Sequence, residues 1–246
     1  MSERISNLRS SQRLRAYTNL PVEILVVSLS LAPIFILVYF YPVLPERIPV
    51  FLNLNGDVEQ WAVKSLASVF RLPAMAIDLQ LLCLLMKFAV VQSKPALIER
   101  NMGEISNYHK RITALSAGLW DMLRSFVAVK MNAESLSIFF ASNDRFPNLK
   151  TLLWAISWIV AILGMVGALI YGYRLLIIKR SMNKMTAQSR IKQNIDKAHV
   201  FAGFVYYNSE DSAPFVEKYV FNFANKYVYA LVACVVAYPL LVFWPV

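Results

Sequence analysis

Long apolar runs alternate with shorter polar segments along most of the chain. A helix that crosses a bilayer needs roughly 20 mostly apolar residues. Four runs meet this requirement clearly, at 22–41, 69–92, 151–178 and 227–246. The pattern predicts an all-α integral membrane protein, in which most side chains face lipid or another helix.

A fifth stretch, 112–142, is apolar but contains four charged residues, so it fits either an amphipathic surface helix or a further crossing. Cytoplasmic segments of membrane proteins are enriched in Lys and Arg. The N-terminal arm, 93–111 and 179–197 are all basic. These segments lie on one side only if 112–142 crosses. We therefore expect five crossings, with the N-terminus in the cytoplasm and the C-terminus outside.

The expected organisation follows the chain in five parts. These are a basic cytoplasmic arm at 1–21, a two-helix domain at 22–92 with an outer loop at 42–68, a helical membrane region at 93–178 with two further crossings, a basic cytoplasmic segment at 179–226, and a C-terminal transmembrane helix at 227–246.

Composition supports a membrane protein. Of 246 residues, 58% are hydrophobic and 16% are charged, whereas soluble domains have about 45–50% apolar and about 25% charged residues. The net charge of +10 would suit nucleic acid, but no zinc finger or other nucleic-acid-binding motif is visible. We interpret the charge as a topology signal beside anionic lipid, and expect the bilayer as a partner and no nucleic acid.

No catalytic, cofactor or metal site is expected. Cys83 and Cys234 lie singly inside apolar runs, and His109 and His199 lie in polar segments. Phosphate-binding, nucleophile-elbow and zinc-protease motifs are missing. The chain also has only seven glycines, so a phosphate-cradling loop is not expected. The sequence therefore favours a non-enzymatic role.

The charges within apolar runs are expected to face protein and to pair, because a charge near the bilayer centre costs about 2.5–3.5 kcal/mol on insertion scales. Spacings of three and four residues place Asp121 with Arg124, and Lys130 with Glu134, on one helix face. Similar depth suggests pairs between helices, which would join Asp78 to Lys130 and Arg71 to Glu134. The charges singled out as candidate site residues are Asp78, Asp121, Arg124, Lys130 and Glu134.

These charges have more than one interpretation. They could form an ion or proton relay, they could be neutralised pairs that fix helix register, or they could bind a partner. A relay built on histidine or on matching broken helices has no support in the sequence.

The loop after the first run is predicted to be ordered. Its three prolines exclude a regular helix. Val50, Leu52 and Leu54 alternate before Asn55-Gly56, a pattern typical of a short extended segment that ends in a tight turn. Trp61 suits the membrane interface. We expect a cap on the outer helix ends, either a rigid interfacial loop or a binding surface.

Several residues of this loop resemble a bacterial membrane domain of unknown function that forms the N-terminal part of SdpI-type immunity and signalling proteins. They are Leu44, Pro45, Ile48, Pro49, Asn53, Gly56, Trp61 and Lys64. Phe51 stands where many members of that family have a histidine, so histidine-dependent chemistry is not expected to carry over.

A second stretch, 203–218, resembles a short motif of proteins that often carry the same N-terminal domain. The matching residues are Tyr206, Tyr207, Asn208, Asp211, Phe215 and Lys218. The expected topology places this motif in the cytoplasm, where it is either a local turn or a docking surface for a cytoplasmic partner.

The first resemblance implies an SdpI-type role in the bacterial inner membrane, namely protection from a membrane-acting peptide toxin and sequestration of a regulator. The outer loop would then meet a peptide ligand, and the inner motif a regulator. Two alternatives remain open: an accessory or structural subunit of a larger membrane complex, with the charges of 112–142 facing neighbouring chains, and a small ion-coupled transporter.

Overall fold

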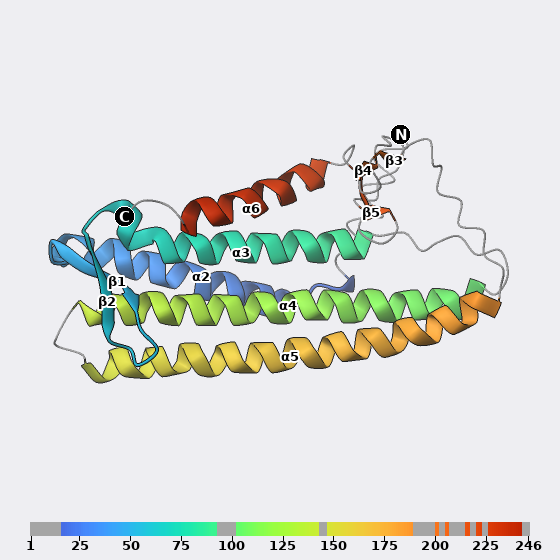
Figure 1. Ribbon diagram of the computed structural model, residues 1–246, viewed down its shortest axis with the longest axis horizontal. Helices are drawn as coiled ribbons and strands as arrows, with labels where there is room; N and C mark the ends of the chain where they lie inside the picture. Colours follow the sequence, from blue (N-terminus) through green and yellow to red (C-terminus); the bar gives the residue numbers. More distant parts are fainter. Residues whose placement is uncertain are drawn as a thin grey trace. The chain divides into compact units, whose positions relative to one another are not determined.

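A computed structural model describes residues 16–92, 102–142, 147–188, 200–201, 205–206, 215–216, 220–222 and 226–242. The chain is mostly helical (Figure 1). The long helices are α2 (Leu20–Phe40), α3 (Leu66–Gln92), α4 (Met102–Ala141), α5 (Pro147–Gln188) and α6 (Lys226–Val242).

Four of these helices are long and apolar enough to cross a membrane. The candidate spans are Leu20–Val43, Leu66–Val91, Lys110–Ala141 and Asn148–Ile178. The charged stretch at 112–142 is thus one of them. The apolar part of α6, Tyr227–Leu241, is shorter. A multi-pass membrane protein is therefore supported, whereas the count of five crossings stays a prediction.

The chain forms two compact units. One, here called the hairpin unit, comprises Leu20–Leu82, Met122–Val166 and Cys234–Val246. The other, here called the sheet unit, comprises Met1–Asn19, Cys83–Asp121 and Gly167–Ala233.

A β-hairpin follows α2 in the hairpin unit. After a 3-10 turn (η1, Tyr41–Val43), strand β1 (Arg47–Leu52) pairs with strand β2 (Val58–Val63) in antiparallel fashion. Irregularities on either side of Phe51 bend the ladder. Figure 1 shows the hairpin across the ends of the helices in this unit.

The hairpin and the helix ends share one apolar core. This arrangement follows from the sequence, since the apolar side chains of β1 that face inward meet apolar residues of α2, α3 and α4. The cluster contains Leu37, Leu44, Ile48, Val50, Ala62, Val69 and Phe139. Burial of this kind contributes about 25 cal/mol per Å² of apolar area. The hairpin is therefore an integral part of the fold.

The sheet unit contains four short strands in the order β3-β4-β6-β5. They are β3 (Val200–Phe201), β4 (Val205–Tyr206), β5 (Phe215–Val216) and β6 (Val220–Asn222). The sequence pointed here to a local turn or a docking surface, and no strands were predicted. Tyr206 and Phe215 of the predicted motif lie in β4 and β5, whereas Tyr207, Asn208, Asp211 and Lys218 lie outside the described residues.

Candidate functional site

Asn53 and Gly56 build the tip of the hairpin. The Asn53 side-chain oxygen accepts hydrogen bonds from the backbone N–H groups of Asn55 and Asp57, both at 2.9 Å. The N–H of Gly56 donates to the Asn53 carbonyl at 3.0 Å. Gly56 has φ +83°, a left-handed conformation that glycine adopts without steric cost. The two motif residues are therefore explained by turn geometry.

Trp154 of α5 holds this tip in place. Its indole Nε1–H donates to the Leu54 carbonyl at 3.3 Å. A Cβ on Gly56 would lie 3.0 Å from Trp154 Cδ1, so the ring packs directly on the glycine backbone. This contact was not predicted, because it joins residues about 100 positions apart in the sequence.

Lys64 closes the base of the hairpin. Its Nζ donates to the Leu44 carbonyl at 2.8 Å and lies 5.4 Å from the centroid of the Tyr41 ring. Its backbone N–H donates to the Glu46 carbonyl at 2.7 Å. Lys64 thus joins both ends of the loop.

Two serines begin α3 immediately after the hairpin. Ser65 Oγ accepts from the Ser68 N–H at 3.0 Å, and Ser68 Oγ accepts from the Ser65 N–H at 2.9 Å. This reciprocal arrangement satisfies backbone donors at the helix start, as a capping box does. It fixes where α3 begins and therefore how the hairpin enters it.

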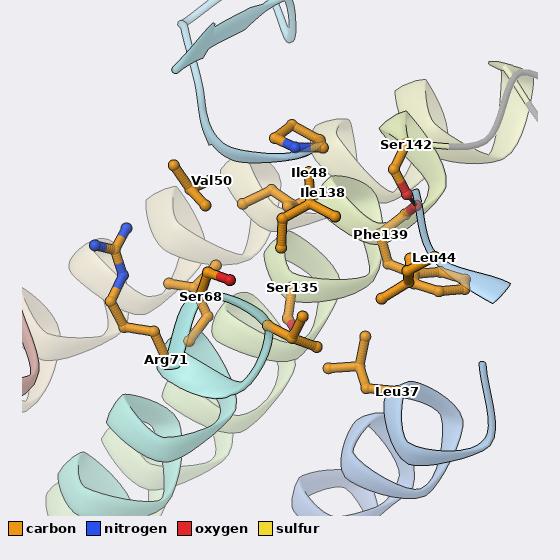
Figure 2. Close-up of a pocket in the computed structure, with 13 residues that line it drawn as sticks. Leu37, Leu44, Ile48, Val50, Ser68, Arg71, Ser135, Ile138, Phe139 and Ser142 are labelled. Atoms are coloured by element: carbon orange, nitrogen blue, oxygen red, sulfur yellow. Dashed lines mark hydrogen bonds between the residues drawn. The ribbon is translucent and has the colours of Figure 1, made fainter. Parts of the chain in front are cut away.

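An open hollow lies beneath the hairpin. It contains about 410 Å³ of empty space, including its solvent-open mouth. Figure 2 shows Arg71 on one side of it, and Leu44, Phe139 and Ser142 on the other. Most of the lining is apolar, with four polar exceptions. The lining residues from the hairpin and from α2, α3 and α4 include Leu37, Ile48, Pro49, Val50, Ser68, Arg71, Ser135 and Ile138.

The four polar exceptions are Arg71, Ser68, Ser135 and Ser142. In the part of the chain that the structure describes, Arg71 makes none of the ion pairs found. Its guanidinium offers five N–H donors and a permanent positive charge. An apolar hollow with one cation and a few hydroxyls is suited to a ligand that has an apolar body and one anionic group.

The residues of the predicted loop motif thus fall into three groups. Leu44, Ile48 and Pro49 line the hollow, and Asn53, Gly56 and Lys64 shape and close the hairpin. Pro45 and Trp61 are exposed. None of these positions needs a bound group to explain its geometry.

Three predicted charges of α4 have partners inside the hairpin unit. Lys130 Nζ binds the Glu134 carboxylate, as the four-residue spacing predicts. Arg124 Nη2 binds Glu23 of α2, not Asp121. Because α2 and α4 are joined in this way, the prediction of an Asp121–Arg124 pair is wrong.

Asp121 binds Lys87 instead, in the sheet unit. Lys87 Nζ lies 2.7 Å from each carboxylate oxygen, and the Lys87 side chain is 1% exposed. Lys87 could have been identified from the sequence as a charge that needs a partner, since it lies inside the second apolar run. Spacing along α4 favoured Arg124 as the partner of Asp121, because spacing within one helix takes no account of residues on neighbouring helices.

The suggested pairs between α3 and α4 are not formed. Lys130 and Glu134 bind each other, which leaves neither for Asp78 or Arg71. Asp78 of α3 lies beside Cys234 of α6, and its Oδ2 has no hydrogen-bond partner. Depth was too weak a guide here because it does not say which face of α3 each residue occupies.

Within the described residues, no group of three or more His, Cys, Asp or Glu side chains is placed to hold a metal ion.

Comparison with known families adds one finding. Residues 29–77, which run from the middle of α2 through the hairpin into α3, match a domain of unknown function (DUF1648). The match covers the loop motif and both strands. Comparisons with curated proteins and with solved structures give no significant match.

Proposed function

We propose that this chain is a non-enzymatic receptor of the bacterial inner membrane with an SdpI-like immunity or signalling role. In this proposal the hairpin and the hollow beneath it form the ligand-facing outer end, and the segment at 203–218 docks a cytoplasmic regulator. The N-terminus lies in the cytoplasm, and five crossings place the C-terminus outside.

The observation that carries the proposal is the hollow itself. Loop residues that turn geometry does not require, Leu44, Ile48 and Pro49, form part of its wall, and Arg71 supplies a positive charge at its side. Binding sites for small ligands are typically apolar clefts with a few polar groups that fix orientation. A peptide toxin with an apolar segment and a carboxylate has matching chemistry.

The charges of α4 support the accessory-subunit alternative less well than they support the receptor. It expects Asp121, Arg124, Lys130 and Glu134 to face neighbouring chains, and the structure gives all four a partner within this chain. The alternative remains as an outcome of the test.

The test compares cells that have and lack the protein. Deletion should sensitise the native host to a membrane-acting peptide, and expression of the intact chain should restore resistance. Arg71→Gln should fail to restore it at a normal level in the membrane. Arg47→Gln, which removes an exposed charge from the same hairpin, is the matched control and should restore it.

Unchanged resistance to every peptide tested, together with stoichiometric purification with other membrane proteins, would contradict the receptor and favour the subunit.

A further inference from the structure

Three helices of the hairpin unit place polar side chains in their shared interior. Ser30 of α2, Gln80 of α3 and Asn132 of α4 are 6%, 8% and 6% exposed. Hydrogen bonds connect all three at one turn of α2. Ser30 Oγ lies 2.7 Å from Gln80 Oε1, and Asn132 Nδ2 donates to the Leu29 carbonyl at 2.8 Å. We call this set the amide site.

Each of the two side-chain amides makes these contacts through one of its polar atoms, and its other polar atom has no partner. Gln80 Nε2 and Asn132 Oδ1 are both buried and make no hydrogen bond. Buried polar atoms in folded proteins nearly always have a partner, either protein or ordered water. An orphaned polar atom costs several kcal/mol in a bilayer, where no bulk water can reach it.

Rotation of the Gln80 amide does not remove the orphan. Ser30 Oγ also lies 2.6 Å from the Val26 carbonyl oxygen, and its one proton can be given to one oxygen only. If that proton goes to Val26, Gln80 Nε2 can donate to Ser30, but Oε1 is then left unpaired. Either orientation leaves one buried amide atom of Gln80 without a partner.

We propose that ordered water occupies the amide site and hydrogen-bonds to Gln80 and Asn132. Water both donates and accepts, so it serves the amides in either orientation, whereas a cation or an anion would suit one orientation only. Internal waters typically make about three hydrogen bonds to otherwise unsatisfied groups.

The amide site lies below the hollow. Ser30 is seven residues before Leu37, and Gln80 is eight residues after Leu72, and both Leu37 and Leu72 line the hollow. At 1.5 Å rise per residue the separation is about 10 Å. Asn132 is one turn from Ser135, a hydroxyl of the same lining. The hollow thus lies about two helical turns from this water along α2 and α3.

A second orphan of the same kind occurs further along α4. Arg124, 5% exposed, binds Glu23 through Nη2, while Nη1 has no hydrogen bond. Glu23 is seven residues from Ser30, so both lie on one face of α2. This places a further water position along the same helices.

The test uses brief X-ray irradiation of the full chain in lipid nanodiscs. Hydroxyl radicals formed from an ordered water oxidise sulfur side chains beside it, and mass spectrometry locates the products. Cys83, one turn from Gln80, and Met131, next to Asn132, are both buried. They should be labelled faster than Met165, which is 61% exposed on α5 in a lipid-facing position.

The double variant Gln80→Leu/Asn132→Leu keeps similar side-chain volume and removes both orphan amides. Labelling of Cys83 and Met131 should fall to the level of Met165. Ser137→Ala is the matched control, since it removes a buried hydroxyl that binds the Lys150 carbonyl away from the amide site. It should leave the labelling unchanged.

Two results would overturn the proposal. One is labelling of Cys83 and Met131 in the wild-type chain no faster than that of Met165. The other is labelling that persists in the double variant. The first needs no variant, so it decides the matter even if the double variant fails to fold.

Discussion

At the scale of single residues, Gly56 is a position where the hairpin tolerates little change. Its φ of +83° lies in the left-handed region, and a Cβ would lie 3.0 Å from Trp154 Cδ1, closer than an ordinary contact. Any other residue at this position would meet both the left-handed backbone conformation and the close approach of Trp154. The glycine in the loop motif therefore has a structural cause.

Gly56→Ala is expected to lower the free energy of unfolding by about 1–2 kcal/mol from the backbone conformation alone, and further from the contact with Trp154. Thermal unfolding in detergent would measure the change. Gly172→Ala is the control, because nothing lies within 4 Å of that position. Equal stability of the two variants would contradict this account of Gly56.

Residue-scale pairing was the part of the site that the sequence predicted least well. Spacing along α4 predicted Lys130–Glu134 correctly, but the same argument failed for Asp121 and Arg124, because each of these binds a residue of another helix. Glu23–Arg124 and Lys87–Asp121 join different helices, and their formation depends on helix rotation and packing. The polar residues that line the hollow, Ser135 and Ser142 among them, were missed for the same reason.

The two kinds of pair should respond differently to removal of the lysine. Lys87→Met leaves Asp121 without its buried α3 partner, and should cost roughly 3 kcal/mol. Lys130→Met breaks a pair within α4 whose lysine is 34% exposed, and should cost about 0.3–0.5 kcal/mol. Unfolding of both variants, measured side by side in lipid-detergent micelles, gives the comparison.

The double variant Lys87→Met/Asp121→Leu checks that pairing is the cause. It should be more stable than Lys87→Met alone, since it removes the carboxylate that has lost its buried lysine partner. A double variant less stable than the single one would show that packing of the Lys87 stem matters more than its charge.

At the scale of elements, the apolar runs predicted the helices well. The structure extends the predicted runs at one or both ends, since polar residues continue a helix once its apolar part has formed; for example, 151–178 becomes Pro147–Gln188. Strand β1 was indicated by Val50 and Leu52. Strand β2 was not predicted, because Glu59-Gln60 interrupts any alternation and its pairing depends on the turn at Asn53.

The hairpin is expected to depend on one contact with α5. Trp154→Leu removes the hydrogen bond to the Leu54 carbonyl and the ring that packs on Gly56. A hydrogen bond of this kind contributes about 1 kcal/mol. Hydrogen–deuterium exchange at the tip, 53–57, should therefore quicken, while exchange in the helices stays unchanged.

Trp61→Phe serves as the control for that experiment. Trp61 lies in the same hairpin, but its side chain is 55% exposed. Exchange at the tip should match that of the wild-type chain. If both variants loosen the tip equally, the effect belongs to aromatic content and not to the contact with α5.

At the scale of the whole molecule, apolar side chains lie outside and many polar ones inside. Among the residues that the structure describes, large apolar residues of α2 and α5 are exposed, whereas ten polar or charged residues are buried. This order suits a chain surrounded by lipid, where charges and amides are expected to face protein. Composition alone already indicated a chain surrounded by lipid, since 58% of the residues are hydrophobic.

The number of crossings is the whole-molecule property that most needs measurement, and α6 decides it. Its 17 residues span about 26 Å at 1.5 Å per residue, near the lower limit for a helix that crosses a bilayer. Tyr238 and Leu241 of α6 pack against the cluster of Met75, Ala76 and Met131, so the part of α6 from Cys234 onward is packed within the hairpin unit. We therefore expect it to cross.

Alkaline phosphatase fused after Val246 should be active, whereas alkaline phosphatase fused after Gln188, the last residue of α5, should be inactive. Inactive enzyme at both positions would mean four crossings and a cytoplasmic C-terminus. Activity after Gln188 would reverse the predicted orientation, and the hairpin with its hollow would then face the cytoplasm.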